Sequence, residues 1–366
     1  MESIRILHAA GLALDAPFEA LGAAKVAAAA ALTRTALTDL VRLSHEKKAD
    51  VVLLGPDTLQ NGYASAETVS FFRECMEALA PICTVIVPGR RDAFSSASLY
   101  AGMRFSSHVR MFHESVLRKV SVPHLPVTVY GRACLEDTAC APLTVRAEQD
   151  ERIHLYLSNG TETAEELAAF GAHVAFMHGE QPSLTQTEEG NAICTSASVT
   201  RRDFTVGGTG SAMLLTLTQG EDGTTAAETE ELRLFPLHYE TVHVSLDGVS
   251  STDDVAKALS RAMADAACDA HTVLRVIFEG MLPLDFPMYA LKNAISACEK
   301  DLFHVCMTDA THPDLAHRFC GDGAARGLTL HSELVRAATE QAAVREADVL
   351  RAASAALEGR SLGDAL

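Results

Sequence analysis

The stretch TVIVPGRRDAF at residues 84–94 joins an apolar strand to a Pro-Gly turn that carries two arginines and an aspartate. Polar side chains just beyond the end of a buried strand are a common way to hold chemistry at the edge of a sheet. A hydrolytic site at such a turn normally uses an amide and an imidazole. Arg90 and Arg91 instead bring fixed positive charge beside the carboxylate of Asp92. This chemistry suits the binding of an anion or the neutralisation of carboxylates.

The elements that must position this turn alternate between strand and helix. Residues 4–8, 51–54 and 83–87 are apolar runs that predict strands, and residues 23–48 and 66–79 have the length and spacing of helices. Strands rich in Val, Ile and Leu that are separated by long helices indicate a parallel sheet covered on both faces. A polar, turn-rich segment follows each strand, and in such sheets these segments line the site.

From about residue 104 the pattern changes to shorter strand-like pieces, which predict a second sheet packed on the first and hence an α/β sandwich. A glycine-rich run at 207–210, GGTG, looks like a phosphate loop, but no helix follows it. A turn between two strands is the favoured interpretation of this run. The predicted strands of this part are 127–131, 153–157, 174–177, 193–198, 211–218 and 232–236.

Three domains are predicted along the chain. Residues 1–237 form the α/β sandwich, and residues 238–326 form a small α+β domain in which strands and helices alternate. Residues 327–366 form a C-terminal helical tail, which is mostly one long, Ala-rich helix. The apolar stripe of that helix packs either on the chain's own body or on a partner helix.

Charge and composition limit the functional classes. The formal net charge is −18, so a bare polyanion such as DNA is repelled by the average surface. Tryptophan is absent and aromatic residues make up 5%, which weakens any platform for base stacking. Nine cysteines without a C-x-x-C pair indicate reduced thiols in a cytoplasmic protein, rather than a zinc site or a disulfide framework. We expect neither a signal peptide nor a membrane span.

Several segments together resemble the calcineurin-like metallophosphoesterases, and most closely their SbcD-like DNA repair exonuclease branch. The likeness covers about the first 235 residues. It implies a metallophosphoesterase-type β-sandwich flanked by helices, followed by a small α+β capping domain and a C-terminal helix. The segments that carry it are IRILHAA at 4–10, LDAPF at 14–18, VVLL at 51–54 with NG at 61–62, VIVPGxxD at 85–92, VYGR at 129–132, residues 153–160, GA at 171–172, His178, Pro182 and RDF at 202–204.

The resemblance also implies where two metal ions would bind. In that family carboxylates and imidazoles from several strand ends hold two cations, which clamp the phosphate and generate a hydroxide nucleophile. Of the corresponding positions, Asp57 and His178 keep a ligand, whereas Asn159 and Glu180 are weak or altered substitutes. The catalytic and ligand positions that have lost their function are Gly11, Ala13, Arg90 and Arg91. The resemblance therefore implies a decayed two-metal site with no intact catalytic set.

Two uses of the added positive charge stay open. In the first, the arginines form a metal-free anion site, because a planar guanidinium matches a phosphate without a cation. In the second, Arg90 pairs with Asp57 and Asp92 and only neutralises carboxylates that were left without metals. The candidate anion ligands are Arg90, Arg91, Arg132, Arg201 and Arg202.

These observations predict a SbcD-like protein that is a non-catalytic or weakly active binding or scaffold subunit, related to DNA repair exonucleases. No cofactor is expected. The resemblance implies a coiled-coil ATPase partner like SbcC and a homodimer, with only indirect or weak contact to DNA. One alternative is a residual phosphodiesterase or exonuclease with one Mn²⁺ or Zn²⁺ held by Asp57, His178, Glu180 and Asn159. Another is a metal-free phosphate- or nucleotide-binding protein that uses Arg90 and Arg91.

Overall fold

The computed structural model describes residues 3–314, apart from residues 19, 137, 206, 220–224 and 284–285. The helical tail predicted for residues 327–366 lies outside the described residues. The chain divides into two compact units, Met1–Leu237 and His238–Leu366. None of the helices in the described part combines the length and the apolar character that a membrane span needs.

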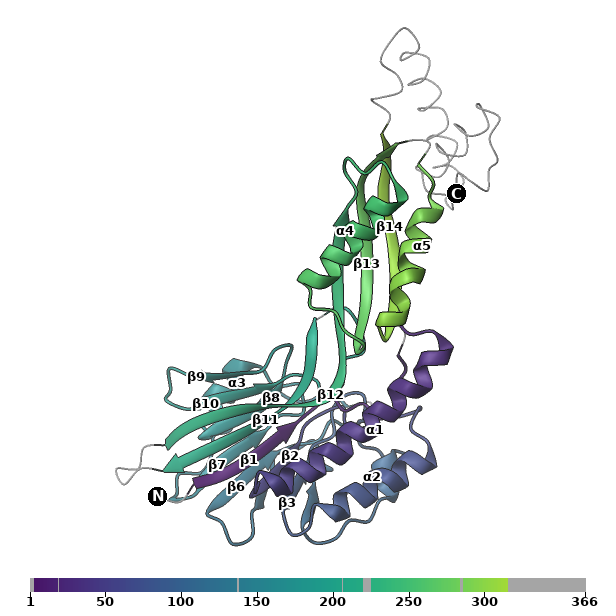
Figure 1. The fold of residues 1–366 in the computed structure, drawn as a ribbon. Coiled ribbons are helices and arrows are strands. Elements are labelled where there is room, and N and C mark those ends of the chain that lie inside the picture. The colour runs from purple at the N-terminus through teal and green to yellow at the C-terminus, as the bar shows by residue number, and fades with distance from the viewer. Residues whose placement is uncertain are drawn as a thin grey trace. The chain divides into compact units, whose positions relative to one another are not determined.

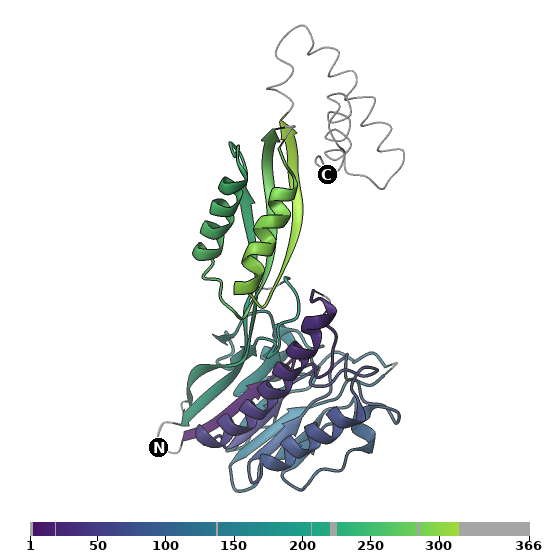
Figure 2. The ribbon, with the colours of Figure 1, turned by 45° about the vertical axis from the view of Figure 1, so that its right-hand side comes forward.

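The first sheet of the first unit holds the predicted parallel strands. β1 lies between β11, which is antiparallel to it, and β2, which is parallel to it, and the order continues through β3 to β4. The helices α1 and α2 lie side by side across one face of these strands (Figures 1 and 2). The elements are β1 (Ser3–Ala9), α1 (Ala23–Glu46), β2 (Val51–Leu54), α2 (Ala66–Ala78), β3 (Cys83–Ile86), a 3-10 turn (Leu99–Gly102), β4 (Val109–Met111) and β11 (Gly208–Gln219).

The second sheet has six strands in the order β5-β6-β7-β8-β10-β9. Its four central strands are parallel, and its two edge strands, β5 and β9, are antiparallel to their neighbours. Together with the first sheet it confirms the predicted α/β fold class. The elements are β5 (Arg118–Ser121), β6 (Val127–Gly131), β7 (Ile153–Leu157), α3 (Ala164–Phe170), β8 (Val174–His178), β9 (Ser183–Gln186) and β10 (Ala192–Ser196).

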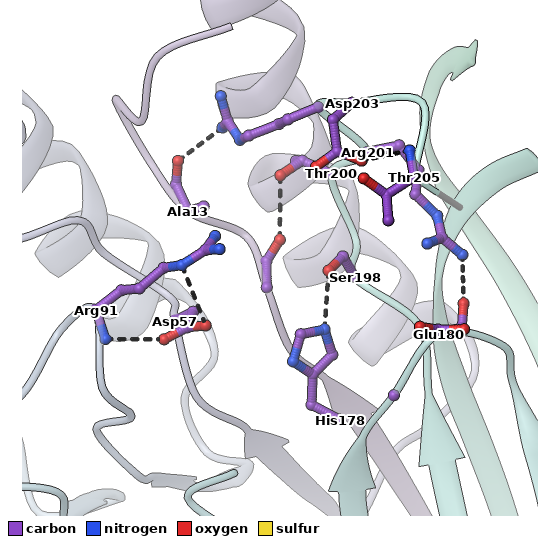
Figure 3. A pocket seen from close by; sticks show the side chains of 13 residues that line it. Ala13, Asp57, Arg91, His178, Glu180, Ser198, Thr200, Arg201, Asp203 and Thr205 are labelled. Carbon is purple, nitrogen blue, oxygen red and sulfur yellow. Dashed lines mark hydrogen bonds and ion pairs between the residues drawn. The ribbon is translucent and has the colours of Figure 1, made fainter. Parts of the chain in front are cut away.

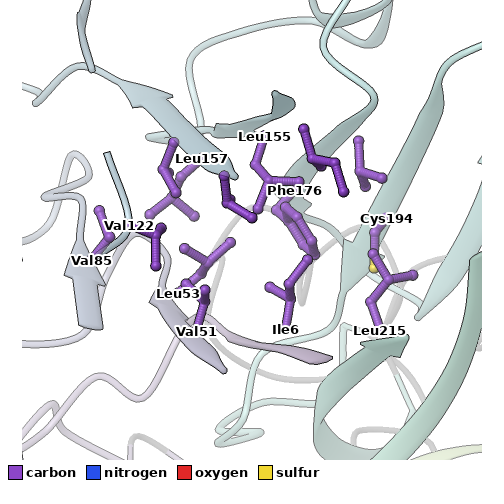
Figure 4. Packing of buried hydrophobic residues seen from close by; sticks show 14 of the residues in the cluster. Ile6, Val51, Leu53, Val85, Val122, Leu155, Leu157, Phe176, Cys194 and Leu215 are labelled. Atoms are coloured by element: carbon purple, nitrogen blue, oxygen red, sulfur yellow. The ribbon is translucent and has the colours of Figure 1, made fainter. Parts of the chain in front are cut away.

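The two sheets of the first unit share one apolar core (Figure 4). Ile6 and Leu53 from the first sheet pack in the same cluster as Leu155 and Phe176 from the second, and all four are fully buried. Burying a side chain of this size stabilises the fold by about 1.5–3 kcal/mol relative to leaving it exposed. This shared core fixes the two sheets face to face, and so fixes which strand ends meet.

Local sequence signals begin and end the helices. The side chain of Ser65 caps α2 by accepting a hydrogen bond from the amide of Thr68 at 3.1 Å. On α3, Thr163 and Glu166 form a reciprocal capping box, and Gly171 ends the helix in a left-handed conformation with φ +77°. α3 is not predicted from the sequence, because its seven residues give too short an apolar pattern to recognise.

Two predictions about the end of the first unit are wrong. The glycine-rich run does not form a turn, because Gly208–Gly210 begins β11. A Cβ at Gly210 would lie 1.9 Å from the carbonyl oxygen of Val199, so glycine is needed there for close approach of two main chains. The short strand predicted at 232–236 is part of one long strand, β12 (Thr225–Ser245). Pro236 restricts φ to a value that an extended strand accepts, so the strand continues through it.

The second unit is a small α+β structure, as predicted. From His238 onward β12 pairs in parallel with β13 (Thr272–Pro283), which pairs in parallel with β14 (His304–Asp314). The helices α4 (Thr252–Asp265) and α5 (Tyr289–Cys298) contribute Leu259 and Leu291 to a core that includes Val276 and Phe278 of β13. A short 3-10 turn (Glu299–Asp301) follows α5. Whether this unit is a cap, as the resemblance implies, stays a prediction.

Candidate functional site

A pocket of about 360 Å³ opens in the first unit where several strands end. Gly11 and Ala13 follow β1, Asp57 follows β2, and Arg91 follows β3. His178 ends β8 on the second sheet (Figure 3). The carboxyl ends of parallel strands meet at one edge of a sheet, which is where sites of this fold class form. The other lining residues are Gly179, Glu180, Ser198, Thr200, Arg201, Arg202, Asp203 and Thr205.

The segment after β1 leaves no room for a larger side chain. Gly11 has φ +63° and Ala13 has φ +46°, both in the left-handed region. A Cβ built on Gly11 would lie 2.6 Å from Oγ of Ser198 and 3.0 Å from its Cα. An aspartate, the ligand that the resemblance implies at position 11, would therefore be strained there and would collide with Ser198.

Asp57 is held by the turn that follows β3. Its Oδ1 accepts a hydrogen bond from the main-chain amide of Arg91 at 3.1 Å, and its Oδ2 lies 4.0 Å from Nε of Arg91. The Asp57 side chain is 18% exposed and that of Arg91 is 64% exposed. The hypothesis that Arg90 neutralises this carboxylate is wrong in its residue, because Arg91 makes the ion pair. Arg90 is exposed and does not line the pocket.

Asp92 organises the main chain around the pocket instead of pairing with an arginine. Its carboxylate accepts hydrogen bonds from the amides of Gly89 at 2.7 Å, Asp57 at 3.1 Å, Thr58 at 2.9 Å and Leu59 at 3.3 Å, and from the hydroxyl of Tyr100 at 2.8 Å. Burial, and then the nearby Asp57, raise the pKa of Asp92 to about 6, although these hydrogen bonds act to lower it. Asp92 therefore joins the segments after β2 and β3 and helps to place Asp57.

His178 shares a hydrogen bond with Ser198, whose Oγ lies 2.8 Å from Nε2 of the imidazole. Burial, more than any neighbouring charge, lowers the pKa of His178, and Arg201 and Arg91 lower it further while Asp57 raises it. The lowered pKa favours the neutral imidazole. No sequence motif singles out Ser198, and the only signal for it is its place near the end of a predicted strand.

His8, on β1, is fully buried in the core. Its ring is 5.3 Å from that of Phe176, and neither ring nitrogen has a hydrogen-bond partner among the described residues. Burial, and then the nearby His178, lower the pKa of His8 to about 3. His8 is thus a neutral group that does not reach the pocket lining.

Arg201 is the buried cation of the pocket. It is 8% exposed, and its Nη2 donates a hydrogen bond to the main-chain carbonyl of Glu180 at 2.6 Å. Its Nε has no hydrogen-bond partner within the described part of the chain. Burial lowers its pKa, against the attraction of Asp203, Glu180 and Glu231. Glu180 meets Arg201 through its carbonyl oxygen, and as a residue it is exposed.

Arg202 also lines the pocket, but its guanidinium fastens the segment after β1. It donates to the carbonyls of Ala16 and Ala13, both at 2.6 Å, and lies over the ring of Phe18 at 4.0 Å from the centroid. A guanidinium so engaged has little capacity left for a ligand, so the structure favours a framework role for this anion candidate.

Arg132 and Asn159 do not line the pocket. Arg132 donates from Nε to Oε1 of the buried Glu162 at 2.8 Å, so this anion candidate is already neutralised. Asn159 is buried, with Nδ2 donating to the carbonyl of Arg132 at 3.1 Å and Oδ1 accepting from the amide of Thr161 at 2.9 Å. The structure brings neither of these two candidates to the site.

The pocket's donor set does not fit a pair of metal ions. Among the described residues, no three His, Cys, Asp or Glu side chains are grouped so that they could hold a metal ion. Asp57 and His178 supply one carboxylate and one imidazole, and the exposed Glu180 and Asp203 also line the pocket but are not grouped with them. A bound first-row dication usually takes four or more ligands. The guanidinium of Arg91 beside Asp57 would also repel a cation.

Comparison with known proteins gives similarities of structure only. No family model matches the chain, and no curated protein matches it. Protein TT1561 of Thermus thermophilus is 14% identical, with a TM-score of 0.38, over 63% of this chain and 100% of its own. A dimetal phosphatase from Danio rerio is 10% identical, with a TM-score of 0.38, over 63% of this chain and 99% of its own. Chaetomium thermophilum Vps29 is 14% identical, with a TM-score of 0.28, over 63% of this chain and 97% of its own.

Proposed function

We propose that this chain is a SbcD-like metallophosphoesterase-fold protein with a decayed two-metal site, and that it works as a non-catalytic binding or scaffold subunit. One observation carries the proposal: a Cβ at Gly11, the first ligand position of the resemblance, would meet Oγ of Ser198 at 2.6 Å. A side chain that could ligate a metal has no space there, so the change is built into the packing of the pocket.

The ion pair of Asp57 with Arg91 supports the same function. Two-metal hydrolysis requires two cations about 3.5–4 Å apart, which bind both the attacking and the leaving oxygen. The carboxylate that would bridge the two cations is that of Asp57. It accepts a hydrogen bond from the main-chain amide of Arg91 and lies 4.0 Å from the guanidinium of Arg91. His178, which shares a hydrogen bond with Ser198, is the one imidazole left at the ligand positions that the resemblance implies. This arrangement can bind polar ligands but supplies no metal-generated hydroxide.

The partners that go with this proposal follow from the resemblance and from charge. A scaffold subunit of this branch would act as a homodimer in the cytoplasm and would bind a coiled-coil ATPase like SbcC. The net charge of −18 makes unaided binding to DNA unfavourable, so contact with DNA would be indirect or weak. Co-purification with such an ATPase would test the first partner, and sedimentation analysis of the chain alone would test the homodimer.

A residual one-metal phosphodiesterase is the second candidate, because Asp57, His178 and Glu180 line the same pocket. The experiment that separates the two is metal analysis of the full chain after incubation with Mn²⁺ or Zn²⁺ and dialysis, together with hydrolysis of a nitrophenyl phosphodiester. We expect far less than one equivalent of metal, and the same background hydrolysis for the wild type and the Asp57→Ala variant. Asp265→Ala, an exposed aspartate on α4, is the matched control. One bound equivalent together with hydrolysis that only Asp57→Ala abolishes would overturn the proposal.

A further inference from the structure

The buried guanidinium of Arg201 has a hydrogen-bonding capacity that the described chain does not use. Its Nη2 is anchored on the carbonyl of Glu180 at 2.6 Å, while its Nε has no partner in the described residues. A buried polar group without a partner is unfavourable, and more so when it is charged. Such a group therefore points to a ligand that accepts a hydrogen bond.

The carboxylates around Arg201 do not neutralise it directly. Asp203, Glu180 and Glu231 attract it, yet none forms an ion pair with it within 4.0 Å in the part of the chain that the structure describes. Asp203 and Glu180 are both exposed, and Asp203 accepts a hydrogen bond from the amide of Thr205 at 2.8 Å. The positive charge of Arg201 thus stays available at the pocket wall.

A second guanidinium lies on the other side of the pocket. Figure 3 shows Arg91 and Arg201 on opposite sides of the pair formed by His178 and Ser198. Nε of Arg91 is 4.0 Å from Asp57, which is too long for a hydrogen bond, and its side chain is 64% exposed. Arg91 can therefore turn from Asp57 towards a ligand at little cost. In the tautomer in which Nε2 of His178 donates to Ser198, the hydroxyl of Ser198 is a further donor between the two arginines.

We propose that this pocket binds the phosphate group of a small phosphomonoester without a metal ion, held by Arg201 and Arg91. A tetrahedral dianion takes donors from several directions, and a guanidinium binds it with charge-assisted hydrogen bonds. A volume of about 360 Å³ is in the range of small-molecule sites and exceeds what a bare phosphate fills. The inference rests on the proposed function, because it requires that metal ions do not occupy the pocket.

The test is isothermal titration of the full chain in the presence of EDTA, with adenosine monophosphate in one arm and inorganic phosphate in the other. We expect both to bind, and the monoester to bind more tightly because it fills more of the pocket. Arg201→Gln is expected to weaken binding roughly tenfold or more, as the loss of a charge-assisted hydrogen bond does. Arg91→Gln is expected to weaken it by a smaller factor, since Arg91 is more exposed. Arg104→Gln, an exposed arginine outside the pocket lining, is the matched control and should leave the affinity unchanged.

Each outcome decides the inference. If neither probe binds at millimolar concentration, or if the Arg201 and Arg91 variants bind like the Arg104 control, the inference is overturned while the proposed function stands. If binding appears only when Mn²⁺ or Zn²⁺ is added and EDTA abolishes it, the proposed function fails as well. Should Arg201→Gln not fold, the exposed Arg91→Gln still gives the decisive comparison.

Discussion

Arg132 and Glu162 form an ion pair of 2.8 Å in which the two side chains are 6% and 0% exposed. Glu162 also accepts hydrogen bonds from the hydroxyls of Tyr156 at 3.1 Å and Ser158 at 2.8 Å, and from the amide of Asn159 at 3.2 Å. The pair thus fixes the segment after β7. Arg132, which the resemblance places near the site, therefore has a structural role, because the buried carboxylate of Glu162 needs a positive partner.

Removing Arg132 is expected to destabilise the first unit strongly. Arg132→Ala leaves Glu162 as an unpaired buried charge, which in such pairs lowers the free energy of unfolding by about 3–5 kcal/mol. Arg118→Ala is the matched control, because Arg118 pairs with Glu114 at the surface, where loss of the partner has little effect. Urea unfolding at pH 7 compares the two. Equal stabilities of the two variants would contradict the role given to the buried pair.

Asp92 is expected to be needed for the fold of the pocket. The amide of Gly89 donates to Oδ1 of Asp92 and that of Thr58 donates to Oδ2. Asp92→Asn replaces one of these two oxygens by a donor, so one of the two amides loses its acceptor while the other keeps it. Each amide left unpaired should lower the free energy of unfolding by roughly 1–3 kcal/mol. Hydrogen exchange gives a local readout, and the amide that loses its acceptor should exchange faster than the same amide does in Asp265→Asn. Unchanged protection of Gly89 and Thr58 would rule out this role.

His8 and Asp92 are expected to change stability with pH in opposite directions. The pKa of His8 is lowered to about 3 by burial and by His178, so the unfolded chain binds its proton first as the pH falls. Above pH 6.5 His8 is neutral in both the folded and the unfolded chain, so it does not reduce the free energy of unfolding. Between pH 6.5 and pH 3 the free energy of unfolding falls as the pH falls, by about 2 kcal/mol at pH 5. The pKa of Asp92 is raised to about 6, so folding is penalised above pH 6 and stability is regained as the pH falls towards 4.

Because these effects partly cancel, the difference between variants is the useful measurement. Between pH 7 and pH 5, His8→Phe should gain about 2 kcal/mol of unfolding free energy relative to the wild type, since it removes the group that titrates unfavourably. His113→Phe, at an exposed histidine, should follow the wild type. Parallel curves for His8→Phe and the wild type would show that His8 has an ordinary pKa in the fold.

Gly11 is expected to tolerate a side chain less well than Gly62, which also has a positive φ. Gly11 has φ +63° and Gly62 has φ +85°, so alanine is strained at both by about 1–2 kcal/mol. Only at Gly11 does the added Cβ meet a neighbour, Oγ of Ser198 at 2.6 Å, whereas nothing lies within 4 Å at Gly62. The midpoint temperature of thermal unfolding should therefore be lower for Gly11→Ala than for Gly62→Ala. Adding Ser198→Gly should recover part of the difference, and no recovery would show that Ser198 is not the obstacle.

Much of the fold follows from local patterns in the sequence. The continuous apolar runs at 51–54, 127–131 and 153–157 are β2, β6 and β7 with the same bounds. Long amphipathic segments likewise predict α1 and α2, because a buried strand or helix carries its own periodicity. The short strands β4, β5 and β9 and the helix α3 are not predicted, since three to seven residues give too little pattern.

The sequence by itself determined the types and the order of the residues at the strand ends, including the glycine and alanine after β1 and the two arginines after β3. Only the tertiary structure decided that Arg91 meets Asp57, that Arg132 is neutralised by Glu162, and that Ser198 faces Gly11. The physical reason is that strand periodicity is a property of a few consecutive residues. The partner of a charged or hydroxyl side chain, in contrast, depends on which distant strand ends the shared core of the two sheets brings together.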